Sequence, residues 1–417
     1  MSPFDLSVLF FLQLAVVLVV CRVISALATR VGQPPVVGEM IAGVMLGPSL
    51  LGYLWPEAQQ ALFPPASKPI LFSGAQIGLA LYMFTVGLDF RFDLVRARIR
   101  SAVAISAAGI FVPFAFGCAI AWALLTRGGF FPEGVTAVQA IPYMGAAMAI
   151  TAFPMLARII FERGLSGTTV GALALAAGAI DDAAAWGVLA LVLASLGHDP
   201  WIAVMAIGGA GVFVLVLFTA GRWLLARIVA LAAKGEAAER AALGWMMVLL
   251  MIAAWFTDMI RLYAVFGAFF LGAAVPRGAF VKRLQALIEP LTTSLLLPLF
   301  FIYSGLNTRF DLVNDPFLWL VAAGVLAAAV IGKAGACYAA ARACGETHHE
   351  AMGVGSLMNA RGLMELIILN IGLERGIITP TLFSILVFMA IVTTLMATPM
   401  FNRFYRSADG SAFRKAG

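Results

Sequence analysis

The sequence predicts an all-α protein that crosses a membrane many times. Of its 417 residues, 62% are hydrophobic and only 12% are charged, and the mean hydropathy is +1.00. A soluble globular chain is roughly half apolar and about a quarter charged. In lipid, helices satisfy their own backbone hydrogen bonds, so a chain this apolar is expected to form a bundle of transmembrane helices. The composition excludes an ordinary cytosolic enzyme, a nucleic-acid-binding protein and a disordered chain.

Residue types that carry hydrolytic or metal chemistry are scarce. The chain contains only 3 His and 4 Cys, so most hydrolytic chemistry is excluded, and no cofactor or enzymatic activity is expected. Cys21, Cys118, Cys337 and Cys344 lie in or beside apolar runs, and none has the Cys-x-x-Cys spacing. We expect them to act as small hydrophobic side chains, not as disulfides or metal ligands.

Thirteen apolar runs approach or exceed the roughly 20 residues that a transmembrane helix needs. They are 5–28, 35–54, 69–88, 101–126, 139–161, 167–195, 199–230, 241–258, 262–276, 286–307, 316–341, 350–373 and 378–401. The first five residues include no Lys or Arg, whereas a signal peptide begins with a basic segment, so the first run is expected to be a retained span. Because no connecting segment is long enough to fold alone, residues 1–417 are expected to form a single transmembrane domain with no soluble regulatory domain.

The positions of the basic residues support this count. Cytoplasmic loops of membrane proteins carry an excess of Lys and Arg. If the N-terminus lies outside and the spans alternate, the basic loop residues fall roughly four to one on the inner side. Arg22, Arg158, Arg222 and Arg227 lie toward the inner ends of their runs and are counted with the inner side, whereas Lys333 and Arg361 lie well inside theirs and are counted with neither. The sequence therefore predicts a multi-pass protein with its N-terminus outside and its C-terminus in the cytoplasm.

The two halves of the chain repeat short motifs in the same order. Residues 87–94 match 305–312 at six of eight positions, Glu162-Arg-Gly164 matches Glu374-Arg-Gly376, and Gly38-x4-Gly43 matches Gly267-x4-Gly272. The members of each pair lie seven predicted spans apart, an odd number, so they cross the membrane in opposite directions. Such an inverted-topology repeat is common among secondary transporters. The repeat units are spans 1–6 and 8–13.

Two adjacent carboxylates, Asp181 and Asp182, lie near the centre of the sixth run. A charge at the centre of a bilayer costs roughly 2.5–3.5 kcal/mol on insertion scales. One interpretation is a structural ion pair or a helix-packing contact, for which one carboxylate would suffice. The other is a site for cations and protons, because carboxylate oxygens can coordinate a bare cation or take up a proton.

Lys333 is the candidate partner of these carboxylates. It lies in the eleventh run between Gly332 and Gly335. A lysine in a span can extend its ammonium toward the membrane surface. Small flanking residues instead favour close packing against another helix, and we therefore expect Lys333 to face the protein interior, within salt-bridge distance of Asp181.

The fifth and twelfth runs are expected to be broken near the membrane midplane. The fifth contains Thr151 and Pro154, and the twelfth contains Asn359-Ala-Arg361 and Glu365. Broken helices at matching positions of two inverted repeats mark the binding site of many transporters. Thr151 and Asn359 then offer oxygen ligands or helix caps, and Arg361 can neutralise the carboxyl end of a half-helix.

Simpler interpretations of these two runs stay open. Pro154 can produce a plain kink, because proline removes a backbone donor. Glu365 lies one helical turn after Arg361, so the two can form a purely structural ion pair.

Taken together, these motifs resemble the monovalent cation–proton antiporters. The resemblance rests on A-x-x-I-D-D at 177–182, Ile331-Gly-Lys-Ala-Gly335 and N-A-R-G-L-x-E-L at 359–366, and it covers nearly the whole chain. It is strongest to the second branch of that superfamily, which includes the NapA-type sodium–proton antiporters and the plant CHX-type exchangers. Residues 150–158 and 362–370 look especially like the CHX-type exchangers.

The resemblance implies a homodimer of thirteen-span subunits in the bacterial inner membrane, with a role in pH homeostasis. Within each subunit, two discontinuous helices, spans 5 and 12, cross. A transport core of about 101–195 and 316–401 moves against a dimer scaffold of about 5–88 and 241–307. Asp182 takes the Na⁺ or K⁺ transiently with Asp181 beside it, and Asp181 pairs with Lys333.

This chain departs from its relatives in three places. CHX-type members commonly have Asn at the position of Asp181. The sodium antiporters usually carry Glu at the position of Leu363, whereas the acid here is Glu365. Glutathione-gated potassium efflux relatives continue into a nucleotide-binding domain, and this sequence ends at Gly417 without one. The choice between Na⁺ and K⁺ therefore stays open.

Exchange of a monovalent cation for protons is the leading hypothesis, with no nucleic acid involved and the lipid bilayer as surroundings. The alternative is a sodium-coupled symporter of a small organic solute, which needs a polar cavity. A channel is disfavoured because it would need a repeated filter sequence, and none is present. An intramembrane aspartyl protease is disfavoured because it needs its two aspartates on different helices, whereas Asp181 and Asp182 are adjacent on one. We also expect the exchange to move net charge, with two protons for each cation.

Overall fold

All regular secondary structure in the described part of the protein is helical. The computed structural model describes residues 2–33, 35–90, 99–165, 167–181, 184, 201–260, 264–306, 315–361, 365, 368–369, 372–373 and 375–405, without the side chains of Pro154, Trp201, Ile202, Ala203, Ala206, Ile207 and Ser304. Within these ranges no residue lies in a strand. The all-α prediction is therefore confirmed for the described residues.

Among the described residues, nine helices are long and apolar enough to cross a membrane. They are Pro3–Arg30, Pro35–Leu54, Pro56–Asp89, Ile99–Leu125, Gly208–Ala232, Glu236–Met259, Ala279–Tyr303, Pro316–Ala343 and Pro380–Phe404. Two shorter apolar helices are Thr169–Asp181 and Ala264–Ala274. The fifth and twelfth predicted runs are split into shorter pieces, so length alone does not count them. Thirteen spans stay a prediction.

The chain divides into two compact units. The first comprises Met1–Ile24, Glu39–Phe90 and Leu193–Thr308, and the second comprises Ser25–Gly38, Arg91–Val192 and Arg309–Gly417.

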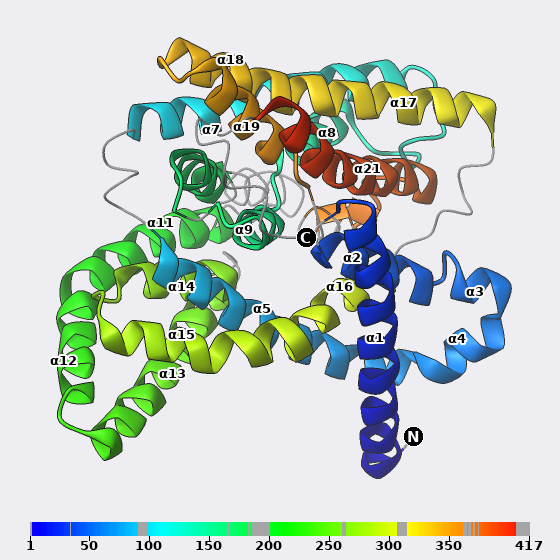
Figure 1. The fold of residues 1–417 in the computed structure, drawn as a ribbon. Helices are drawn as coiled ribbons and strands as arrows, with labels where there is room; N and C mark the ends of the chain where they lie inside the picture. The colour runs from blue at the N-terminus through cyan, green and yellow to red at the C-terminus, as the bar shows by residue number, and fades with distance from the viewer. Residues whose placement is uncertain are drawn as a thin grey trace. The chain divides into compact units, whose positions relative to one another are not determined.

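The first unit is organised around α5 (Lys68–Asp89), which packs against α14 (Ala264–Ala274) and α16 (Leu297–Gly305) (Figure 1). Its other α-helices are α1 (Pro3–Arg30) as far as Ile24, α2 (Pro35–Leu46) from Glu39 onward, α3 (Leu51–Leu54), α4 (Pro56–Leu62), α11 (Trp201–Val216), α12 (Arg222–Ala232), α13 (Glu236–Met259) and α15 (Ala279–Leu291). Glycines let α5 and α14 touch: a Cβ on Gly87 would lie 2.2 Å from the carbonyl oxygen of Phe269, and one on Gly272 would lie 2.3 Å from that of Phe84. The backbones therefore meet where no side chain fits.

The second unit contains the helices of the candidate site. They are α7 (Ile99–Leu125), α8 (Ala137–Ala149), α9 (Phe153–Glu162), the helix Thr169–Asp181, α17 (Pro316–Val330), α18 (Ala336–Ala343), α19 (His348–Met358) and α21 (Pro380–Phe404). A π-helical turn, Ile331–Gly335, joins α17 to α18, and this continuous run lies along α7 (Figure 1). Such π turns interrupt the regular helical hydrogen bonding and occur often at functional sites.

Local sequence signals explain where these helices begin. Thr136 with Gln139, and Thr347 with Glu350, form capping boxes at the first turns of α8 and α19. Thr379 caps α21 ahead of Pro380. Because the side-chain oxygens accept the free N–H groups of a first turn, these positions fix the start of each helix.

Within the second unit, the segment between α1 (Pro3–Arg30) and α2 is hydrogen-bonded to residues at the end of α9 and in α21. Arg163 donates to the carbonyl of Gly32 at 2.7 Å, Gln33 donates to that of Leu395 at 3.2 Å, and the backbone N–H of Val36 donates to Glu162 at 3.4 Å. The Glu162-Arg-Gly164 motif, which the sequence repeats at 374–376, therefore holds the connection between α1 and α2 at Gly32 and Val36.

Candidate functional site

A buried ion pair between Lys333 and Asp181 forms the centre of the site. Lys333 comes from the π turn and Asp181 from the end of the described helix Thr169–Asp181. Lys333 Nζ lies 2.6 Å from Asp181 Oδ2, and both side chains are 0% exposed. The predicted pairing is confirmed, and extension of Lys333 to the membrane surface is excluded.

Two backbone carbonyls complete the surroundings of the ammonium. Lys333 Nζ donates to the carbonyl of Gly109 at 2.7 Å and to that of Ala149 at 2.5 Å. With Asp181, these acceptors use all three N–H donors of the ammonium. Lys333 therefore joins α7, α8 and the helix of Asp181 at a single point.

The Gly109 carbonyl is available because of Pro113. In a regular helix the N–H of residue 113 would donate to the oxygen of residue 109, but proline has no N–H. The same relation recurs in α21, where Pro399 frees the carbonyl of Leu395 that Gln33 uses. Gly109 and Pro113 are not among the residues predicted from the sequence, although a proline inside an apolar run signals a free carbonyl four residues earlier.

Gly109 also has no space for a side chain. A Cβ there would lie 2.9 Å from Cys337 Sγ, 3.6 Å from Asp181 Oδ1 and 3.7 Å from Lys333 Cε. The close approach of α7 to the ion pair therefore needs glycine at this position.

Thr151 lies in the interruption of the fifth predicted run. α8 ends at Ala149 and α9 begins at Phe153, so residues 150–152 are not helical. The Thr151 hydroxyl donates to Asp181 Oδ2, the oxygen that Lys333 also contacts. Asp181 Oδ1 is buried and receives no hydrogen bond from the described residues. One carboxylate oxygen thus stays available as an acceptor.

Arg361 covers the carboxyl end of α8 together with Lys333. Its guanidinium donates to the carbonyl of Met148 at 2.5 Å and to that of Ala147 at 3.5 Å, while Lys333 takes the next carbonyl, that of Ala149. The last carbonyls of a helix have no partner inside the helix and carry partial negative charge. Two buried cations therefore satisfy three successive carbonyls. This is the neutralisation expected of Arg361.

Glu365 is the second buried carboxylate of the site. Its Oε1 lies 3.4 Å from Arg361 NH1, with the two side chains 1% and 0% exposed. This confirms the expected pairing, at a longer distance than in the Lys333 pair. Glu365 Oε2 receives no hydrogen bond from the described residues. The second pair is therefore the looser of the two.

Residues 359–361 are held by α21. α19 ends at Met358, and residues 359–361 are not helical. Asn359 Nδ2 donates to the carbonyl of Thr393 at 3.4 Å, and the backbone N–H of Arg361 donates to the Thr394 hydroxyl at 3.0 Å. Asn359 Oδ1 has no donor among the described residues. The sequence analysis missed both threonines, which lie side by side in the last apolar run.

Tyr143 is another site-forming residue that the sequence analysis missed. From α8 it donates to the carbonyl of Ile368 at 3.0 Å, and a Cβ on Gly372 would lie 1.9 Å from its hydroxyl oxygen. This contact links α8 to the chain after Glu365.

Two predicted residues, Asp182 and Pro154, are described only in part or not at all. Asp182 lies outside the described residues. The backbone of Pro154 belongs to the first turn of α9, and its side chain is not described. The described part of the site therefore brings together Asp181, Thr151, Lys333, Arg361 and Glu365, with Asn359 beside Arg361 on the same non-helical segment.

The sequence is similar to those of known transmembrane antiporters. A family model described as "Sodium/hydrogen exchanger, transmembrane" matches residues 15–405. The chain is 38% identical to the Na⁺/H⁺ antiporter NhaS4 of Synechocystis, over 95% of this chain and 97% of that protein. It is 34% identical to the cation/H⁺ antiporter 18 of Arabidopsis thaliana, over 98% of this chain and 50% of that protein. This chain thus spans about half the length of the plant relative.

A solved structure shares the fold. The sodium–proton antiporter MjNhaP1 of Methanocaldococcus jannaschii superposes with a TM-score of 0.62 over 94% of this chain and 96% of that one, at 16% sequence identity. At this identity the likeness concerns the fold alone.

Proposed function

The chain belongs to the sodium/hydrogen exchanger family, and we propose that it exchanges a monovalent cation, Na⁺ or K⁺, for protons across a membrane. The family is one of multi-pass membrane transporters, not of catalytic enzymes. The observation that carries the proposal is the fully buried Asp181–Lys333 pair, in which Asp181 Oδ1 has no donor among the described residues.

The charges of the site suggest how one carrier can serve two ions. The two described carboxylates, Asp181 and Glu365, are matched by two described cations, Lys333 and Arg361. Asp182 adds one further carboxylate to the sequence of the sixth run. A proton or a monovalent cation on Asp182 would neutralise that extra charge, so the two ions compete for it. The carrier then has to release one ion to bind the other.

The cation would be held by oxygen atoms. We assign Asp182 and Asp181 as the carboxylate ligands and Asn359 as an amide ligand. Thr151 supports Asp181 through its hydroxyl, while Lys333, Arg361 and Glu365 stabilise the site. Carboxylate and amide oxygens suit hard cations.

Membership of the family supports a proposal for the wider architecture. We propose thirteen spans in two inverted repeats, with the interrupted spans 5 and 12 crossing at the site. We further propose a homodimer in a bacterial inner membrane, with the N-terminus outside and the C-terminus in the cytoplasm. A transport core of about 101–195 and 316–401, which includes the site, would move against a dimer scaffold of about 5–88 and 241–307. Accessibility of tags at the two termini in intact cells tests the orientation.

The exchange itself is tested in liposomes that contain the purified protein and a trapped pH dye. Na⁺, K⁺, Li⁺ and Rb⁺ are added in turn, and at least one is expected to drive proton movement that protein-free liposomes lack. Because protons and cations compete for one site, the half-saturating cation concentration should rise as the pH falls. If no cation moves protons, or if the half-saturating concentration is the same at every pH, the proposal fails.

A further inference from the structure

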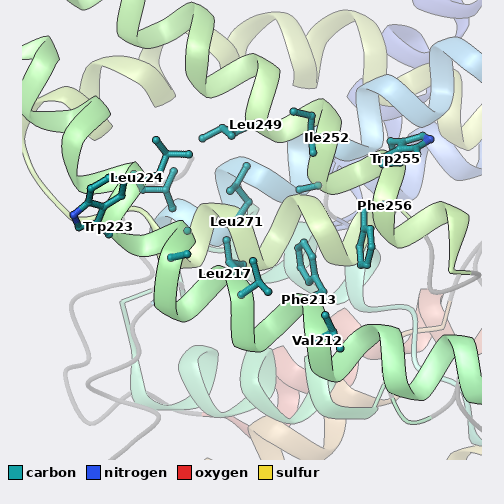
Figure 2. A pocket seen from close by; sticks show the side chains of 15 residues that line it. Val212, Phe213, Leu217, Trp223, Leu224, Leu249, Ile252, Trp255, Phe256 and Leu271 are labelled. Carbon is teal, nitrogen blue, oxygen red and sulfur yellow. The ribbon is translucent and has the colours of Figure 1, made fainter.

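A residue that carries protons across a membrane needs a titratable side chain that is shielded from bulk water. The pocket of ≈ 500 Å³ among α11, α12, α13 and α14 in the first unit offers none, because only hydrophobic residues and glycine line it (Figure 2). Among the described residues, Asp181 and Glu365 are the two carboxylates that are 0% exposed. Asp181 is already assigned as a ligand of the cation, which leaves Glu365.

The charged form of Glu365 has fewer hydrogen-bond donors than that of Asp181. Asp181 Oδ2 accepts from Lys333 Nζ at 2.6 Å and from the Thr151 hydroxyl. Glu365 Oε1 lies 3.4 Å from Arg361 NH1, and its Oε2 has no donor among the described residues. A cationic N–H group usually lies about 2.7–2.9 Å from a carboxylate oxygen. A buried charge with so little support is costly, and uptake of a proton removes that cost.

Arg361 does not depend on Glu365 for its own hydrogen bonds. Its guanidinium donates to the carbonyl of Met148 at 2.5 Å, which is closer than its contact with Glu365, and to that of Ala147 at 3.5 Å. These carbonyls at the end of α8 carry partial negative charge. Glu365 can therefore become neutral without leaving the arginine unpartnered.

The other groups that act on Glu365 do not hold its charge in place. Besides Arg361, these are Lys333 of the π turn and Tyr143 of α8. Lys333 uses its three N–H donors on other acceptors, and Tyr143 uses its single O–H on the carbonyl of Ile368. Neither residue has a hydrogen left to donate to Glu365.

We propose that Glu365 is a further proton-binding residue of the exchange cycle. The proton comes from water on one side, bonds to a carboxylate oxygen of Glu365 and returns to water on the other side, so no co-reactant is needed. A cation bound at Asp181 adds positive charge next to Lys333, and positive charge favours the ionised form of Glu365. Binding of the cation therefore promotes release of this proton. The inference rests on the proposed exchange, although the proton on Glu365 can be detected without it.

Infrared spectroscopy of the purified protein tests the proton directly, because a carboxylic acid has a C=O stretching band that a carboxylate lacks. The difference spectrum between low and high pH, recorded without an ion gradient, should lose one such band in Glu365→Gln. Glu346→Gln is the control and should keep that band. It changes a buried glutamate outside the site, to which Ser101 donates at 2.7 Å. If the difference spectrum of Glu365→Gln matches that of the wild type, Glu365 takes up no proton and the proposal fails.

The number of protons moved for each cation provides a second measurement. This ratio, obtained in liposomes from the membrane potential at which the flux reverses, should fall by one in Glu365→Gln and stay unchanged in Glu346→Gln. Glu365→Asp keeps a carboxylate and should recover the wild-type ratio. Because glutamine resembles the protonated acid, Glu365→Gln should melt close to the wild-type temperature.

Two further results would overturn the proposal. A melting temperature far below the wild-type value in Glu365→Gln would mark a purely structural ion pair with Arg361. An unchanged ratio in Glu365→Gln would assign any second proton to another group, such as the Asp181–Lys333 pair. If no cation moves protons through the wild-type protein, the exchange itself is refuted, and the infrared band still decides whether Glu365 binds a proton.

Discussion

The ammonium of Lys333 lies 2.6 Å from the carboxylate of Asp181, with both side chains completely buried. Neither charge has water to solvate it, so each depends on the other and on the polar groups around them. Thr151 and the carbonyls of Gly109 and Ala149 supply those groups. We therefore expect stability and transport to depend on the same few atoms.

Loss of the lysine should destabilise the protein. Lys333→Ala leaves Asp181 buried without its partner, and breaking a buried pair in this way costs about 3–5 kcal/mol. We expect a clearly lower melting temperature in detergent, together with altered exchange. The double variant Lys333→Ala with Asp181→Asn removes both charges and should recover part of the loss. A melting temperature unchanged by Lys333→Ala would show that the pair contributes nothing to stability.

Loss of the second aspartate should abolish exchange without unfolding the protein. Asp182→Asn removes the carboxylate that we propose binds the proton and the cation in turn, so cation-driven proton movement in liposomes should fall to the protein-free level. Asp258→Asn changes an exposed carboxylate of α13 and should leave exchange intact. Substantial exchange by Asp182→Asn would assign the ion to another residue.

The exchange should move net charge. If the Asp181–Lys333 pair takes up a second proton when Asp182 is protonated, two protons cross for each monovalent cation. A membrane potential would then act on the cycle by about 2.3 kcal/mol per 100 mV for each charge moved. The measurement is the exchange rate in liposomes with an imposed or a collapsed potential. An exchange rate that changes neither when a potential is imposed nor when it is collapsed indicates one-for-one exchange.

Restoring the missing hydrogen bond of α7 should harm the site. In Pro113→Ala, the new N–H competes with Lys333 for the carbonyl of Gly109, and a hydrogen bond to a charged group contributes about 1.5–3 kcal/mol. The melting temperature should therefore stay level or fall, although alanine is the better helix former. Pro142→Ala, in α8 and away from the ion pair, should raise it. An equal rise in both variants would argue against a special role for Pro113.

Alanine should be tolerated at position 109 only if Cys337 is replaced by a smaller residue. Gly109→Ala brings a Cβ to 2.9 Å from Cys337 Sγ, so it should lower both the melting temperature and exchange. Cys337→Ala alone should have little effect on exchange. Combining the two removes the sulfur and should restore much of the activity. If the double variant is as impaired as Gly109→Ala, another contact excludes the methyl group.

The charged centre of the site could be predicted from the sequence because isolated charges in apolar runs are costly. That argument identified Asp181, Lys333, Arg361 and Glu365, and the structure pairs the first two and the last two. The interruptions near Pro154 and Asn359 were equally visible, because proline and a polar cluster break the apolar pattern. Asp182 stays a prediction, since it lies outside the described residues.

The acceptors around those charges could not be predicted in the same way. The Lys333 ammonium uses carbonyls that lie 224 and 184 residues earlier in the chain, and Arg361 reaches one that lies 213 residues earlier. Every residue has a carbonyl, so composition does not mark the ones that become ligands. Two sequence signals do point to free carbonyls: Pro113 marks that of Gly109, and the break expected in the fifth run marks the carboxyl end of a half-helix.

Lys333 and Arg361 together bind the last carbonyls of α8, and this contact sets the order in which the site can form during synthesis. Residues 147–149 and Asp181 are synthesised long before Lys333 and Arg361, which later bind their oxygens. Until the second half of the chain enters the bilayer, the first half holds uncapped carbonyls and a carboxylate without its lysine, each costly in lipid. The site can therefore be completed only after both Lys333 and Arg361 have been synthesised and inserted.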